Sequence, residues 1–209
     1  MGKLLLGELE AVNIKGKGLV MQKDLRTEEL EVNTDSIAID AFKAASGEIV
    51  LTQPTDASNR VILTEQDLER AFNAEYIQQK LQELEVDVDG QPVKVNTAYV
   101  DFHLPGEGKV AFSADITLVE AGETKQISFT AVPRISEDEH CVSLEDVQYA
   151  EGTEDSQELT AVLLESAREL LDLRNFELPD MSLRFQELDV QKSKLTLQAK
   201  AYVEKFPGS

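Results

Sequence analysis

The sequence predicts an α+β fold in which a strongly curved, long-stranded antiparallel sheet wraps around two amphipathic helices. Three observations predict it: apolar and polar residues alternate through most of the chain, several alternating runs are long, and two segments carry helical spacing. Alternation gives one dry and one wet face, which is typical of antiparallel sheets. Long strands with a single dry face must curl around something, and we expect the helices to fill that concavity.

The strands are predicted from this alternation and from the turns between them. Alternating runs cover residues 12–14, 19–23, 98–104, 109–118, 127–131, 181–190 and 194–204. Turn-forming residues at 105–108, 121–123 and 191–194 connect neighbouring runs as hairpins. Between residues 181 and 190 the apolar parity slips by one position, which indicates a β-bulge near Gln186 and Glu187.

The two helical segments each have one apolar face. The first begins after Thr64, an N-cap candidate with Asp67 three residues on, and Asn73 indicates a break into two short helices. The second begins after Ser156, another N-cap candidate, and ends near Asn175.

The chain is strongly acidic, and this excludes some classes of function. Asp and Glu number 40 against 20 Lys and Arg, so the formal charge of the 209 residues is −20. That balance argues against unaided binding of nucleic acid and against a polybasic clamp on an anionic bilayer. Because Cys141 is the one cysteine, there is no internal disulfide framework. No run approaches the ~18 apolar residues of a membrane span, so we expect the chain as given to be soluble.

Patterns that carry catalysis or bind metals do not emerge from the sequence. His103 lies on the polar side of a strand, while His140 and Cys141 are adjacent on a strand and point to opposite faces. The acidic residues between Glu137 and Asp155 lack the EF-hand pattern and read as a solvated loop. We therefore expect no enzyme activity, no bound metal and no cofactor.

The apolar faces of the helices and the sheet are the candidate binding surface. They fit a filled core, which is the commoner arrangement, or an elongated apolar channel between sheet and helices. If a ligand occupies such a groove, the contact residues expected from their faces are Leu68, Phe72, Ile77, Phe102, Phe112, Leu163 and Leu170.

Three segments resemble the LmeA-like phospholipid-binding family, particularly its cyanobacterial branch. They are residues 14–40 with IKGKGL and DLRTEELEVNTDSIAID, residues 51–81, and the helix-to-strand run at 171–204. The resemblance implies a fold similar to tubular lipid-binding proteins, in which acyl chains lie in a groove between a curved sheet and a helix. Relatives begin further upstream, so we expect one domain over residues 1–209 whose N-terminal leader or segment is absent from this chain.

The leading hypothesis is therefore non-enzymatic binding, and transfer, of a phospholipid or other acyl lipid. The resemblance implies a periplasmic or membrane-peripheral location in the cell envelope, and the sequence is compatible with a cytoplasmic one. Two mildly basic segments, at 1–23 and 184–205, are hypothesised to face lipid headgroups through Lys15, Lys17, Lys192 and Lys194, and ordinary scatter of surface charge is the alternative. The alternative function is a structural or protein-interaction module with a filled core and no lipid, which engages a partner through a sheet edge.

Overall fold

The computed structural model describes residues 8–9, 11–20, 25–46, 50–88, 90–152, 157–177 and 179–205. Antiparallel strands dominate these ranges, and they form two five-stranded sheets and a two-stranded one. The predicted α+β class with a curved antiparallel sheet is confirmed, although the strands divide between two large sheets where the sequence suggested one. No helix within the described ranges is long and apolar enough to cross a membrane.

The first large sheet has the strand order β10-β9-β8-β7-β6, and we call it the covered sheet. Its strands are β6 (Leu84–Val88), β7 (Gln91–Gly106), β8 (Lys109–Leu118), β9 (Glu123–Ile135) and β10 (Val142–Tyr149). Consecutive strands pair as hairpins. For β7 with β8 and for β8 with β9, this confirms the hairpins predicted from the turn residues. Gly108 and Gly122 have φ of 71° and 68° in these turns, a backbone conformation that glycine adopts without strain.

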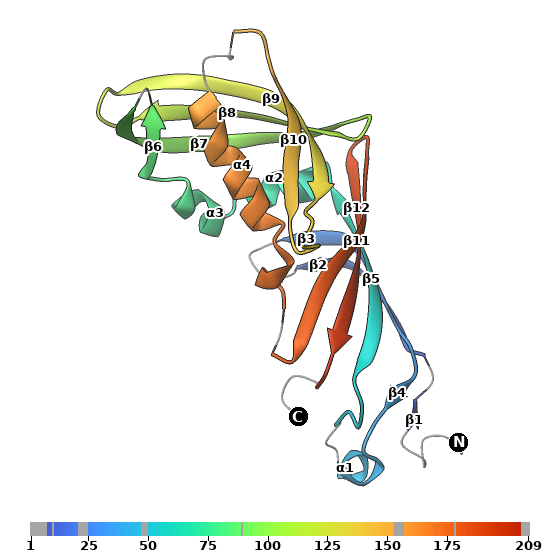
Figure 1. The fold of residues 1–209 in the computed structure, drawn as a ribbon. Helices are drawn as coiled ribbons and strands as arrows, with labels where there is room; N and C mark the ends of the chain where they lie inside the picture. The colour runs from blue at the N-terminus through green and yellow to red at the C-terminus, as the bar shows by residue number, and fades with distance from the viewer. Residues whose placement is uncertain are drawn as a thin grey trace.

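Three helices pack on the covered sheet: α2 (Glu65–Phe72), α3 (Glu75–Lys80) and α4 (Gln157–Leu170). Thr64 caps α2 in a capping box with Asp67, and the chain breaks between α2 and α3 at Asn73 and Ala74, so both predictions are confirmed. The predicted cap Ser156 lies outside the described residues. Helix α2 contacts β7, while α4 contacts β6 and β10 and ends beside the second sheet (Figure 1).

The second large sheet is a strongly curled half-barrel with the order β11-β12-β5-β3-β2. Its strands are β2 (Asn13–Val20), β3 (Arg26–Thr34), β5 (Thr55–Thr64), β11 (Met181–Gln191) and β12 (Lys194–Val203). The predicted bulge is confirmed, since the pairing of β11 with β12 shifts between Phe185 and Glu187. Because Gln186 is the extra residue, Phe185 before it and Leu188 after it both pack toward the core.

A small extension precedes β5. In it β1 (Glu8–Leu9) pairs with β4 (Ile37–Ala38), and the short helix α1 (Ala41–Ala45) follows. Asp40 caps α1 by accepting hydrogen bonds from the backbone N–H groups of Phe42 and Lys43, at 2.9 and 3.1 Å. The extension lies at the end of the half-barrel that is farther from the covered sheet (Figure 1).

The helices cover the two sheets unequally, which differs from the expectation that they fill one concavity. Against the half-barrel, α2 contacts β3 and β5, and residues 171–176, which include the 3-10 turn η4 (Leu173–Asn175), meet its concave face. The physical reason is the length of α4. Its 14 residues extend about 21 Å, and this length packs along the covered sheet. The concave face of the half-barrel is therefore left partly open.

Backbone hydrogen bonds fasten the two sheets to one another. The N–H of Phe185 on β11 donates to the carbonyl of Glu139 at 2.7 Å, and the N–H of Ser193 donates to the carbonyl of Leu104 on β7 at 2.9 Å. The main cluster of buried apolar residues includes members from both sheets, such as Phe129 and Leu197. The half-barrel is thus anchored to the covered sheet at one end.

Candidate functional site

The concave face of the half-barrel holds a cavity of about 500 Å³. This volume lies within the range of about 300–1,000 Å³ that is typical of ligand pockets. Eighteen of its 21 described lining residues are apolar: Ile14, Leu25, Leu30, Val32, Ile37, Ala57, Val61, Leu63, Leu171, Leu173, Phe176, Met181, Leu183, Phe185, Leu197, Ala199, Ala201 and Val203. The other three are Thr34, Thr55 and Asn59, so no titratable side chain is among the described residues that line the cavity.

The floor of the cavity follows from strand alternation and from small residues placed in register. Every second residue of β5, from Thr55 to Leu63, lines the cavity, as does every second residue of β12 from Leu197 to Val203. Ala57 lies opposite Ala201, and Ala199 is the next inward-facing residue of β12. Because an alanine side chain is a single methyl group, these three positions leave volume that larger residues would fill.

The two ends of the cavity differ. At one end Leu63, Phe185 and Leu197 belong to the main apolar cluster and close the cavity. At the other end Thr55 begins β5, and the buried side chain of Ile37 on β4 contributes to the wall. Along the edge strand β2 the cavity reaches the surface, since its lining residue Ile14 is 56% exposed.

The three polar side chains of the lining have different surroundings. Thr34 is satisfied, because its hydroxyl accepts a hydrogen bond from the backbone N–H of Val12 at 3.0 Å. Asn59 is half-buried in the middle of β5. Thr55 is buried, and its Oγ1 has no hydrogen-bond partner among the described residues.

The residues predicted from the sequence to contact lipid do not line this cavity in the described part of the structure. Leu68, Phe72, Ile77, Phe102, Phe112 and Leu163 all pack in the main core cluster with at most 3% exposure, and none of them is among the residues that line the cavity. The Phe112 ring lies 5.1 Å from the Phe72 ring, 5.0 Å from that of Phe102 and 5.2 Å from that of Phe129, between ring centroids. The structure thus brings these six residues together in a packed cluster, and their contact with lipid stays a prediction.

Leu170, the seventh nominated residue, is the last residue of α4, and its side chain lies outside the described part of the structure. The next residue, Leu171, does line the cavity.

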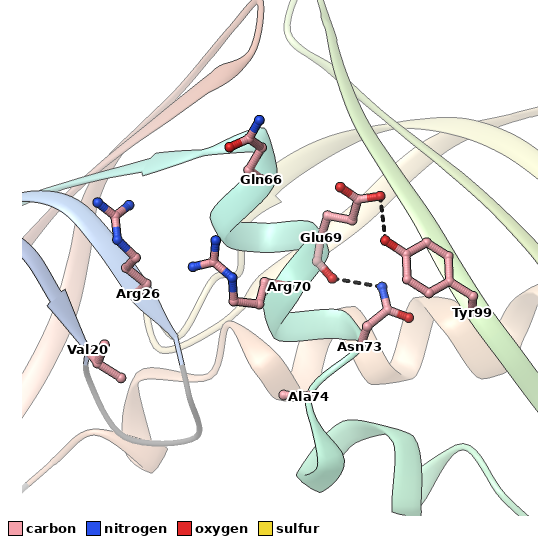
Figure 2. Close-up of a pocket in the computed structure, with 8 residues that line it drawn as sticks. All are labelled: Val20, Arg26, Gln66, Glu69, Arg70, Asn73, Ala74 and Tyr99. Carbon is pink, nitrogen blue, oxygen red and sulfur yellow. Dashed lines mark hydrogen bonds between the residues drawn. The ribbon is translucent and has the colours of Figure 1, made fainter.

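A second hollow, of about 740 Å³, lies beside α2, and six of its eight described lining residues are polar, the other two being Val20 and Ala74 (Figure 2). Several of its polar groups bond to one another: the Tyr99 hydroxyl donates to the Glu69 carboxylate at 2.8 Å, and the Asn73 side-chain amide donates to the Glu69 carbonyl at 2.8 Å. The guanidinium of Arg26 forms an ion pair with the carboxylate of Asp67, with Nη1 and Oδ1 2.8 Å apart. We interpret this hollow as the seam where α2 meets the two sheets.

Asp67 is a buried charge at that seam. Its carboxylate, on a residue 1% exposed, accepts hydrogen bonds from the Thr64 hydroxyl at 2.6 Å and from Arg26 at 2.8 Å. Burial alone would raise the pKa of Asp67, but the hydrogen bonds from Thr64 and Arg26 outweigh it and lower the pKa. The charged carboxylate therefore acts as a clamp between β3 and α2.

Two of the lysines expected to face headgroups are ion-paired on the half-barrel. Lys15 and Lys17 on β2 contact Glu31 and Glu29 on β3, at 3.0 and 2.9 Å. These pairs offset the positive charge of β2 locally, and headgroup contact by the four lysines stays a prediction.

Comparison with known proteins decides the family. The model of the LmeA-like phospholipid-binding family matches residues 1–200 of the 209. The chain belongs to the LmeA-like phospholipid-binding family. No curated protein matches the sequence. Membership confirms the resemblance given by the sequence segments, and it indicates a phospholipid-binding protein rather than an enzyme.

In this LmeA-like chain, the cavity did leave a signal in the sequence. Ala199 and Ala201 stand at consecutive inward-facing positions of β12, between Leu197 and Val203, and Ala57 lies opposite Ala201 on β5. Thr55 and Asn59 stand on the same dry face. Small and polar residues on a dry face indicate a place where packing is incomplete. The sequence prediction missed them because it selected large apolar residues as lipid contacts.

Proposed function

We propose that this chain binds a phospholipid, or another acyl lipid, with an acyl chain in the cavity of the half-barrel, and that it performs no catalysis. The observation that carries the proposal is an apolar cavity of about 500 Å³ whose described lining holds no titratable group, in a chain of a phospholipid-binding family. Each methylene group buried in such a cavity contributes roughly 0.8 kcal/mol. A long acyl chain therefore binds without any charged partner.

The dimensions of the cavity support this occupant. Thr55 and Leu63, which lie near its two ends, are eight residues apart on β5. Eight steps of an extended strand span about 26 Å. The lining is thus elongated along β5, which suits an extended hydrocarbon chain better than a compact ligand.

Transfer of lipid between membranes is the finer part of the proposal. The cavity reaches the surface along β2, where Ile14 is exposed, so an acyl chain can pass between a membrane and the cavity there. We propose that this edge approaches a membrane peripherally, in the cell envelope.

A cavity-filling variant tests the proposal. Ala199→Phe places a ring on the cavity floor, and Ala111→Phe makes the same exchange at a half-buried position of β8, away from the cavity. Each protein is incubated with phospholipid vesicles and re-isolated, and bound lipid is quantified by mass spectrometry of a solvent extract. We expect Ala199→Phe to bind at least about tenfold less lipid than the wild type, a loss of about 1.4 kcal/mol, and Ala111→Phe to match the wild type.

Two outcomes would contradict the proposal. Undiminished binding by Ala199→Phe would place the lipid outside the cavity. A wild-type protein that takes up no phospholipid would favour a protein-interaction module instead.

A further inference from the structure

Thr55 is a polar residue of the cavity whose hydroxyl has no hydrogen-bond partner within the described ranges. The residue is 7% exposed, and its Oγ1 is buried without a hydrogen-bond partner in the described part of the chain. Buried hydroxyl groups are nearly always paired, because leaving one unpaired costs free energy. An unpaired hydroxyl on a cavity wall therefore points to a partner that enters the cavity.

The position of Thr55 defines the kind of partner. Thr55 is the first residue of β5 and lies opposite Val203 of β12, at the end of the cavity next to Ile37. Toward Leu63, the inward-facing residues of β5 are apolar except for Asn59. One polar group at the end of an elongated apolar wall matches an acyl ester, which has a polar carbonyl at one end and hydrocarbon along the rest.

The Thr55 side chain can present its hydroxyl to the cavity. A rotation about χ1 by one staggered step moves the hydroxyl into the position that the methyl group held. The neighbouring hydroxyl of Thr34 already bonds to the backbone of Val12, at 3.0 and 3.4 Å, so it does not need a ligand.

We propose that the Thr55 hydroxyl donates a hydrogen bond to the ester carbonyl of an acyl lipid bound in the cavity. The site then distinguishes acyl esters from ether-linked or plain hydrocarbon chains, and it holds the ester end of the lipid beside β4. This inference rests on the proposed function. Asn59 is the other polar candidate, but its side chain is half-buried and water can satisfy it from the cavity.

The test compares two phosphatidylcholines of equal chain length, one with ester-linked and one with ether-linked chains. Binding of each is measured for the wild type, for Thr55→Val and for Thr97→Val. Thr97 is the matched control because its Oγ1 is also buried and has no hydrogen-bond partner among the described residues. The residue is 1% exposed on the covered sheet, and it is not one of the described cavity residues. Both variants remove an unpaired hydroxyl and keep the shape of the side chain, so both free proteins should resist urea at least as well as the wild type.

We expect the wild type to bind the ester lipid about fivefold more tightly than the ether lipid, which is the scale of one hydrogen bond. Thr55→Val should lose this preference through weaker ester binding alone, Thr55→Ser should keep it, and Thr97→Val should leave both affinities unchanged.

Equal affinity of the wild type for both lipids would overturn the inference and leave the proposed function standing. An ester preference that survives in Thr55→Val, or that disappears in Asn59→Leu instead, would also overturn it. Binding of neither lipid by the wild type would overturn the proposed function itself.

Discussion

The covered sheet and the half-barrel are both five-stranded antiparallel sheets, and they differ in what covers their dry faces. Helices α2, α3 and α4 pack on the covered sheet, and aromatic rings such as those of Phe112 and Phe129 fill the space beneath them. In the half-barrel, alanines stand at the central inward-facing positions, and a cavity lies above them. Alternation thus sets which face is dry, whereas the size of the side chains and the reach of the helices decide whether that face is filled or left open.

The largest expected effect is on the free energy of unfolding after truncation of a side chain in each region. Phe112→Ala should cost about 3–5 kcal/mol, because Phe112 is 2% exposed and its ring contacts three other rings. Leu30→Ala on β3 should cost less than about 2 kcal/mol, because Leu30 is half-buried and faces the cavity. Urea titrations monitored by circular dichroism measure both.

Equal costs for Phe112→Ala and Leu30→Ala would contradict the comparison, since the half-barrel face would then be as tightly packed as the covered sheet. Addition of phospholipid to the Leu30→Ala protein gives a further control. It should raise the free energy of unfolding, because a ligand that binds the folded state stabilises it by mass action.

A smaller effect is expected at the clamp that joins α2 to the half-barrel. Asp67→Asn should lower the free energy of unfolding by about 1.5–3 kcal/mol at pH 7, because it removes the charged acceptor of the Arg26 hydrogen bond. The folded pKa of Asp67 lies below that of an unfolded aspartate, about 3.9, so its contribution is complete above that pH. The contribution is lost as the pH falls through the lower, folded pKa.

Urea titrations of the wild type and Asp67→Asn at pH 7 and at progressively lower pH check this prediction. The two stabilities should converge in acid, whereas the difference between the wild type and Leu30→Ala should not change with pH. A difference between the wild type and Asp67→Asn that persists unchanged in acid would show that the charge of Asp67 does not stabilise the fold.

Much of the fold could be predicted from the sequence because its causes are local. The capping box of Thr64 and Asp67, the break at Asn73 and the bulge after Phe185 each depend on a few neighbouring residues. The division of the strands into two sheets depends on which distant strands pair, such as β5 with β12. Periodicity carries no information on that pairing, so the sequence suggested one sheet.

The small and polar residues of the cavity lining indicate incomplete packing, but periodicity alone does not decide which dry face the helices leave open. The sequence places both Phe72 and Ala199 on dry faces. Of the two, the larger apolar side chain, Phe72, is the one that the sequence predicts as a ligand contact. The structure buries Phe72 under neighbouring rings and leaves Ala199 on a cavity floor. The difference arises because the helices reach along the covered sheet, which is a property of the whole chain.

Photocrosslinking tests the central claim most directly. A phospholipid with a diazirine on its acyl chain is bound to the wild-type protein and irradiated, and the modified residues are mapped by peptide mass spectrometry. We predict modification within residues 55–63 of β5 and 197–203 of β12, the parts of these strands that line the cavity. Modification concentrated at Phe72, Phe102, Phe112 and Leu163 would contradict the account and place the lipid among the helices of the covered sheet.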